Sequence, residues 1–384
     1  MNINRMSQIA VLVSVLALAV SAGARTWTVE QDGSGDWLTL QPAADAAADG
    51  DTILIGPGRY DQFHVSPWSP AQYCIVSLQV QKSLTFIGED LETVIIGPQV
   101  FQLEHAGMLF SGTGPHHFRN ISFENLEIGI TQSSGGTVDN CRFMASTQGC
   151  FFRDGNANVV VTNCVFEGRE YGNSQGESVN ARSLPNVLIE NCVSKDMGIY
   201  LQNIENYEIR NCQFPRTIGG TAVNSYYSNG LIENCDFWGL VGNQGGMLTF
   251  RDCEMSGPPA YNRSNLACEG GQTVIEGCVL NGSSGVDSTI YIQGSAQLSG
   301  SGNHIFKGES STYSIYMFQT SGPDRDLRNN YWGTSDPQQI SDWILDGNDG
   351  PEVNVQVLFE PFSSDPLPVE GPEKSFGGLK AMFR

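Results

Sequence analysis

The chain has 384 residues, of which 40% are hydrophobic and only 16% are charged. This composition can build at least one large hydrophobic core and excludes an intrinsically disordered chain. Twenty basic residues against 41 acidic ones give a formal net charge of −21 at pH 7. A nucleic-acid partner is therefore not expected, because the neutralisation of phosphates needs clustered Lys and Arg.

One apolar run stands near the N-terminus. Arg5 precedes the run 9–20, and the small residues 22–24 follow it. This order is typical of a secretory signal peptide, so we expect residues 1–24 to be removed and the mature protein to be secreted, whether to the periplasm, the cell surface or the medium. An uncleaved anchor is the alternative, although the run is short for a membrane span. No transmembrane segment is expected in the mature chain.

The first folded elements follow the predicted cleavage site. Residues 38–49 are rich in alanine and predict a short helix, and residues 52–55 form an apolar stretch that ends at a Gly-Pro-Gly turn. We interpret the helix as a cover for the first coil of the repeat that comes next.

A repeat occupies most of the chain. Seven of the ten cysteines stand in a similar context, and the same register extends to Asn120-Ile121, Asn303-His304 and Asn330-Tyr331, with spacings of 18 to 28 residues. The seven pairs are Asn140-Cys141, Asn163-Cys164, Asn191-Cys192, Asn211-Cys212, Asn234-Cys235, Asp252-Cys253 and Gly277-Cys278. A repeat of this length with variable spacing indicates a solenoid.

Apolar residues recur two positions after and three positions before each cysteine, as at Phe143 and Ile189. Each side of the Asn therefore alternates with period two, which predicts strands with one buried face. The alternation changes phase at the Asn, so we expect the chain to bend there in the left-handed conformation that Asn tolerates. These features predict an all-β fold, a right-handed parallel β-helix of ten to twelve turns with short helical caps.

A row of alternating charge lies between the two apolar rows. Glu190, Arg210, Glu233, Arg251 and Glu276 change sign from one repeat to the next. In a parallel stack these side chains would lie about 4.8 Å apart, where opposite charges attract. Chance alternation in a polar row is the alternative interpretation.

The cysteine row predicts buried free thiols. An exported protein normally forms disulfides, but side chains at equivalent positions of stacked coils have parallel Cβ directions, which fit the disulfide torsion poorly. Cys74, Cys150 and Cys268 fall outside the row.

The C-terminal part predicts a second cap. Asp336 and Pro337 are good helix-start residues before 338–345, and 353–359 is expected to be a last strand. The β-helix domain thus covers residues 25–362, with a C-terminal cap at about 336–362, and residues 363–384 form a linker and tail.

Several segments resemble the pectin lyase-like superfamily of β-helix proteins. They are Val29 to Trp37, Ala43 to Asp51, Ile53 to Tyr60, Asn329 to Thr334 and Phe359 to Pro361, together with the Asn-Cys-x-Phe coils. The resemblance implies the fold and an extracellular polysaccharide as partner, since the superfamily includes polysaccharide lyases, hydrolases, esterases and epimerases, besides non-catalytic adhesins. The signature segments of pectin methylesterases and polygalacturonases are absent, so the resemblance does not select an activity.

A third strand in each coil is predicted at 149–154, 178–182, 198–202, 222–226, 289–293 and 314–318. Its expected outward residues are Phe151, Arg153, Asn180, Arg182, Tyr200, Gln202, Asn224, Tyr226, Tyr291, Gln293, Tyr316 and Phe318. Aromatic rings stack on sugars, amides bond to hydroxyls, and Arg pairs with carboxylates. A glycan groove is the functional hypothesis, and an ordinary strand surface is the alternative.

Candidate catalytic residues are Arg153, Asp154, Glu177 and Arg182, which could serve β-elimination or hydrolysis. Glu167 and Glu170, in the long loop region of the same repeat, are candidate Ca²⁺ ligands. Each of them is alternatively a solvated surface charge.

The sequence therefore predicts a secreted, monomeric β-helix protein that binds extracellular polysaccharide, and leaves open whether it is an enzyme, either a lyase or a glycoside hydrolase. The acidic net charge favours a neutral glycan or Ca²⁺ bridging. A non-catalytic scaffold or adhesin-like surface protein is the competing hypothesis.

Overall fold

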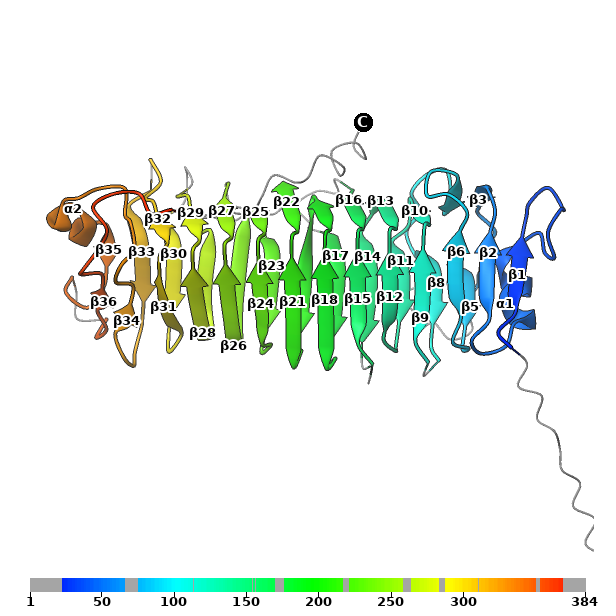
Figure 1. Cartoon of the computed structure of the whole chain (residues 1–384), viewed down its shortest axis with the longest axis horizontal. Helices are drawn as coiled ribbons and strands as arrows, with labels where there is room; N and C mark the ends of the chain where they lie inside the picture. Colours follow the sequence, from blue (N-terminus) through cyan, green and yellow to red (C-terminus); the bar gives the residue numbers. More distant parts are fainter. Residues whose placement is uncertain are drawn as a thin grey trace, which may run out of the picture.

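Strands lie side by side along the whole length of the molecule, and the order along the chain is also the order along the rod (Figure 1). This computed structural model describes residues 23–65, 75–112, 114–153, 155, 157–169, 176–216, 221–257, 264–282, 287–309, 311–349 and 353–368. Each turn of the rod is one coil with three faces, as the prediction of a solenoid requires.

One coil shows the plan. The first face is β18 (Asn186–Glu190), the second is β19 (Val193–Lys195) and the third is β20 (Met197–Gln202). Each strand pairs in parallel with the equivalent strand of the next coil. The fold is therefore a parallel β-helix, while its right-handed sense stays a prediction from the crossover rule.

The second face is a separate sheet of 11 strands, and within the described residues the first and third faces join into one 25-stranded sheet. They join because β26 (Leu240–Arg251) and β28 (Leu266–Glu276) each pair with strands of both faces.

The other first-face strands are β1 (Thr26–Val29), β2 (Thr52–Ile55), β6 (Thr85–Gly88), β9 (His116–Arg119), β12 (Gly136–Asp139), β15 (Val159–Thr162), β21 (Asn206–Arg210), β24 (Gly230–Glu233), β31 (Gln297–Ser301), β34 (Arg325–Asp326) and β36 (Val357–Leu358). The other second-face strands are β3 (Gly58–Tyr60), β7 (Val94–Ile96), β10 (Ser122–Glu124), β13 (Arg142–Ser146), β16 (Val165–Gly168), β22 (Gln213–Arg216), β25 (Asp236–Trp238), β27 (Glu254–Ser256), β29 (Val279–Leu280) and β32 (His304–Ile305). The third face adds β5 (Ile75–Val80), β8 (His105–Phe110), β11 (Ile128–Gln132), β14 (Gln148–Arg153), β17 (Gly176–Arg182), β23 (Thr221–Tyr226), β30 (Ser288–Gln293), β33 (Tyr313–Phe318) and β35 (Ile344–Leu345), and β4 (His64–Val65) pairs antiparallel with β5.

The predicted inward rows form the core. Ile189 and Ile209 are 1% and 0% exposed and pair across β18 and β21. The phenylalanines of the second face stack, with ring centroids 5.0 Å apart between Phe123 and Phe143 and 4.8 Å apart between Phe143 and Phe166. Both alternating rows of the sequence thus point inward, as predicted.

The bend between the first and second faces is made by one residue in the left-handed backbone conformation. Asn163, Asn191, Asn211 and Asn234 have φ values of 55°, 55°, 52° and 53°. The amide of Asn234 donates to Oδ1 of Asn211 at 2.6 Å. The predicted phase change therefore occurs at a ladder of asparagines, whose side chains form hydrogen bonds from one coil to the next.

The register predicted for the last coils was wrong by one residue. Gly302 and Asn329 have the positive φ values of the bend, while Asn303 and Asn330 are fully buried. The backbone N–H of Cys278 donates to Oδ1 of Asn303 at 2.8 Å. Asn303 therefore continues the column of cysteines, and the inward residue that follows is Ile305 rather than Phe306.

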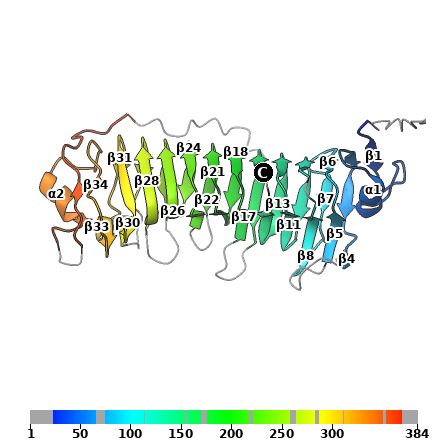
Figure 2. The same cartoon turned by 90° about the horizontal axis from the view of Figure 1, so that it is seen from below.

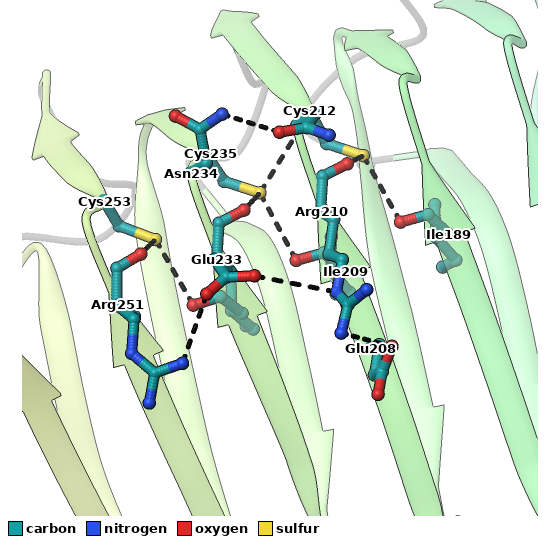
Figure 3. A network of polar contacts seen from close by, with 12 residues as sticks. Ile189, Glu208, Ile209, Arg210, Cys212, Glu233, Asn234, Cys235, Arg251 and Cys253 are labelled. Carbon is teal, nitrogen blue, oxygen red and sulfur yellow. Dashed lines mark hydrogen bonds and ion pairs between the residues drawn. The ribbon is translucent and has the colours of Figure 1, made fainter. Parts of the chain in front are cut away.

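The cysteine column is buried and unpaired, as predicted. Nine cysteines lie in the described part of the chain, and each is a buried free thiol. The Sγ atoms of Cys212 and Cys235 donate to the carbonyls of Ile189 and Ile209 at 3.7 and 3.6 Å (Figure 3). Burial raises the pKa of the Cys212 and Cys235 thiols well above the ordinary value. These thiols therefore stay protonated, pack as small side chains in the core and donate weak hydrogen bonds.

The charged row lies outside the column, on the first face (Figure 3). Arg251 lies 3.2 Å from Glu233 and 3.3 Å from Glu276, and Arg210 lies 3.7 Å from Glu233. The alternation of sign is thus a ladder of ion pairs, as predicted. These pairs are exposed to water and contribute little stability each.

Two short helices lie at opposite ends of the stack (Figure 2). α1 (Leu40–Ala46) is shorter than the predicted 38–49, and Gln41 exchanges two hydrogen bonds with the backbone of Gln79 in β5. α2 (Pro337–Asp342) begins at the predicted Asp336 cap, but it ends before β35 rather than at residue 345. Only Val357–Leu358 of the predicted last strand forms a strand.

The predicted signal peptide lies almost wholly outside the described residues, and so do Cys74 and most of the predicted tail. Among the described residues, no helix has the length and apolar character that a membrane crossing requires.

Candidate functional site

The third face carries the predicted outward residues in two rows. Phe151 pairs with Asn180, which pairs with Tyr200, which in turn pairs with Asn224. Two residues further along the same strands, the second row runs through Arg153, Arg182, Gln202 and Tyr226. We call these eight residues of β14, β17, β20 and β23 the polar–aromatic strip.

Arg182 is the central residue of the strip. Its guanidinium lies 4.9 Å from the ring centroid of Tyr200 and 5.6 Å from that of Phe151. Its Nε donates to Oδ1 of Asn180 at 2.9 Å. A guanidinium placed against two rings is held by cation–π attraction.

Two tyrosines continue the strip. The ring centroids of Tyr200 and Tyr226 are 5.0 Å apart, and the Tyr200 hydroxyl lies 3.4 Å from Oε1 of Gln202. Burial raises the pKa of Tyr226, and the nearby Tyr200 raises it further. The Tyr226 phenol therefore stays protonated at neutral pH, and both tyrosines present a ring face together with a hydroxyl group.

Glu177 stands beside the strip at the start of β17. Its Oε2 accepts a hydrogen bond from Nε2 of Gln148 at 2.7 Å and another from the amide of Asn180. Asn180 is itself fully buried, so the prediction that it contacts a ligand directly does not fit the structure. Its amide joins Glu177 to Arg182 and positions both of them.

Three of the four candidate catalytic residues are therefore close together. Arg153 pairs with Arg182 in the sheet, and Glu177 connects to Arg182 through Asn180. Asp154 lies outside the described residues. A carboxylate beside a guanidinium on one surface is suited to binding a polar ligand, and whether it also catalyses a reaction stays a prediction.

The candidate metal ligands lie on another face. Glu167 belongs to β16 of the second face, where its carboxylate lies 2.6 Å from Nζ of Lys195. Glu170 lies outside the described residues. No cluster of three or more His, Cys, Asp or Glu that could hold a metal ion occurs in the described part of the chain, and a Ca²⁺ site at these two residues stays a prediction.

The aromatic residues predicted further along form a second block. Tyr291 stacks on Tyr316 with centroids 5.9 Å apart, and Tyr313 lies 5.8 Å from Tyr316. Gly242 and Ala267 take the outward positions of the two intervening coils. These two third-face segments were missed in the sequence, although a Gly-Gly pair follows each of them. Gly245, Gly246 and Gly271 have positive φ values and turn the chain toward the first face inside β26 and β28.

A carboxyl pair on the second face was also missed. Asp236 and Glu254 occupy paired positions of β25 and β27, and each directly follows a cysteine of the column. Burial raises the pKa of Asp236 to about 6, and the Glu254 carboxylate adds to this effect. The repeated Cys-acid dipeptide was the sequence signal that could have revealed the pair.

Replacing Asp236 with Asn is expected to stabilise the protein by about 1 kcal/mol at pH 7, after allowance for the part of the carboxyl that stays in water. The folded-state pKa of about 6 exceeds the ordinary value of 3.8, so the wild-type protein loses stability as the pH rises from about 4 to about 6. Denaturant unfolding at pH 4 and pH 7 tests this. The gain should vanish at pH 4, and a gain of equal size at both pH values would contradict the assignment.

The fold is a parallel β-helix. Residues 87–252, less than half of the chain, match the family described as "Periplasmic copper-binding protein (NosD)". Similar solved structures include the A-modules of two mannuronan C-5 epimerases of Azotobacter vinelandii. AlgE4 is 11% identical with a TM-score of 0.40 and AlgE6 is 12% identical with a TM-score of 0.41, and each match covers 84% of this chain and 93% of the other. None of the curated proteins matches the sequence.

Proposed function

We propose that this protein binds an extracellular polysaccharide along the polar–aromatic strip. The observation that carries the proposal is the placement of Arg182 between the rings of Phe151 and Tyr200, with the tilted ring of Tyr226 5.0 Å beyond Tyr200. Rings present flat apolar faces to the C–H groups of a sugar, and the amides and the guanidinium offer hydrogen bonds to its hydroxyl or carboxylate groups.

The parallel stack supports an extended ligand. Equivalent side chains of adjacent coils lie about 4.8 Å apart, so the two rows of the strip repeat similar groups along the long axis of the rod. A polymer that lies along this axis can meet the same kind of contact several times. Multiple weak contacts of this kind sum to useful affinity without a deep pocket.

The charges on the strip limit the class of polysaccharide. Arg153 and Arg182 are its two cationic groups, while Glu177 adjoins them and the whole chain carries −21. Long-range repulsion opposes a polyanion, whereas two guanidinium groups can pair with isolated carboxylates. We therefore favour a neutral polysaccharide or one with sparse uronate residues.

Copper binding, which the matched family's description names, does not fit the described residues. The stacked cysteines are the obvious soft ligands. Their thiols are buried and donate hydrogen bonds to backbone carbonyls of the preceding coil, and no cluster of three or more candidate ligands occurs among the described residues. We assign no metal chemistry to the column.

Replacing Arg182 or Tyr200 with alanine should weaken retention on a polysaccharide roughly tenfold, since each removes one strong ring or guanidinium contact. Affinity electrophoresis through gels that contain laminarin, hydroxyethylcellulose or polygalacturonate measures the effect. Arg119→Ala removes the same side chain from the first face and should leave retention unchanged.

The same experiment can contradict the proposal. Failure of the wild-type protein to be retained by any of the three polysaccharides, or equal retention of Arg182→Ala, Tyr200→Ala and wild type, would favour a scaffold role without sugar binding. Incubation with polygalacturonate, followed by ultraviolet detection of unsaturated products and by a reducing-sugar assay, tests separately whether Glu177 and Arg182 support cleavage.

A further inference from the structure

The chain leaves several third-face strands through a corner residue with a left-handed backbone. Ser183, Asn203 and Tyr227 occupy this position in three consecutive coils, with φ values of 54°, 53° and 48°. The residues just before them pair in the sheet, so the three corners follow one another along the rod. Two of the three corners carry small polar side chains, and the third carries a large ring.

A tyrosine is a costly residue at this corner. Left-handed φ values crowd the Cβ of a bulky side chain, while Asn tolerates them better. Among the described non-glycine residues with a positive φ, Tyr227 is the single aromatic one. Tyr227 is also 70% exposed, so little buried apolar area offsets the strain. Backbone strain that no buried contact offsets occurs mostly at functional sites.

The ring of Tyr227 is nevertheless held in place. A Cβ atom at Gly245, in the next coil, would lie 2.8 Å from Cδ1 of Tyr227. The ring therefore rests against the Gly245 backbone, and a larger residue at Gly245 would displace it. An exposed ring that packs against the backbone on one side is pre-organised to bind a flat apolar partner on the other.

The position of Tyr227 extends the polar–aromatic strip. Tyr226, the preceding residue, is part of the strip, and its ring centroid lies 5.0 Å from that of Tyr200. The chain turns from the third face toward β24 (Gly230–Glu233) of the first face directly after Tyr227. Tyr227 thus stands at the edge of the strip, where the surface turns.

We propose that Tyr227 is a sugar-stacking residue that receives one hexose ring of the polysaccharide bound along the strip. This inference rests on the proposed function, because it adds a contact to the same site. The partner is the apolar C–H face of a pyranose, which packs on an aromatic ring whatever the charge of the sugar.

The test uses Tyr227→Asn, which installs the residue that the preceding coil carries at Asn203. Relief of backbone strain should leave the melting temperature unchanged or raise it, while retention in laminarin, hydroxyethylcellulose or polygalacturonate gels should weaken roughly tenfold with the loss of one stacking contact. Tyr227→Phe keeps the ring and should be retained like wild type.

The outcomes separate this inference from the proposed function. Weaker retention of Tyr227→Asn at an unchanged melting temperature supports it. Loss of retention by Arg182→Ala and Tyr200→Ala, with Tyr227→Asn retained like wild type, overturns the role of Tyr227 alone. A lowered melting temperature of Tyr227→Asn overturns it too, because the tyrosine would then be structural. Equal retention of all variants overturns both proposals.

Discussion

Replacing Phe143 with alanine is expected to lower the free energy of unfolding by about 4 kcal/mol. Phe143 is fully buried, and its ring stacks between Phe123 and Phe166 with centroids 5.0 and 4.8 Å away. The substitution removes a whole ring from the middle of a continuous column. Backbones of adjacent coils are fixed by hydrogen bonds along the stack, so the cavity cannot close easily.

Phe151→Ala is the matched control, because it removes the same side chain from the next strand of the same coil. Phe151 lies on the outer surface of β14 and is only partly buried, so its loss should cost about 1 kcal/mol. Denaturant unfolding followed by circular dichroism compares the two variants. Equal losses would mean that the two phenylalanines have similar surroundings, which would contradict the three-faced coil.

The three-faced coil could be predicted because the repeat marks it in several independent ways. Asn191 and Cys192 locate the bend, and the apolar rows on either side locate the strands. The charges of Arg210, Glu233 and Arg251 then fix which residues are neighbours between coils. Each of these signals depends on local sequence alone, since a period of two and a left-handed residue are properties of the backbone.

Features that depend on neighbouring coils could not be predicted in this way. Asn180 lies between Phe151 and Tyr200 of the two adjacent coils, bonds to Glu177 and Arg182 of its own strand, and is fully buried. Asn303 has the same residue type as the bend asparagines, yet it lies inside the coil because Gly302 takes the bend. The identity of the residue does not distinguish these two positions, and only the register does.

The candidate site also contains both residues that the sequence pattern predicted and a residue that it did not. The outward rows of the strip followed from alternation, so Arg182, Tyr200 and Tyr226 were predicted together. Tyr227 was not, because it breaks the alternation at a corner and its significance comes from the sign of φ and from the facing Gly245. The corner residues Ser183, Asn203 and Tyr227 differ in type, so no recurring residue marks this corner in the way that asparagine marks the bend.

Replacing Asn234 with valine should cost about 3 kcal/mol, from left-handed strain on a β-branched residue and from the loss of the amide ladder. Asn234 has a φ of 53°, and its side chain donates to Asn211 at 2.6 Å. Asn234→Gly removes the ladder bond but relieves the strain, and Gly277 already occupies the equivalent bend in a later coil. Its cost should therefore be only about 1 kcal/mol. Denaturant unfolding of both variants measures the difference, and equal losses would show that the hydrogen bond, rather than the backbone conformation, makes asparagine the preferred residue at the bend.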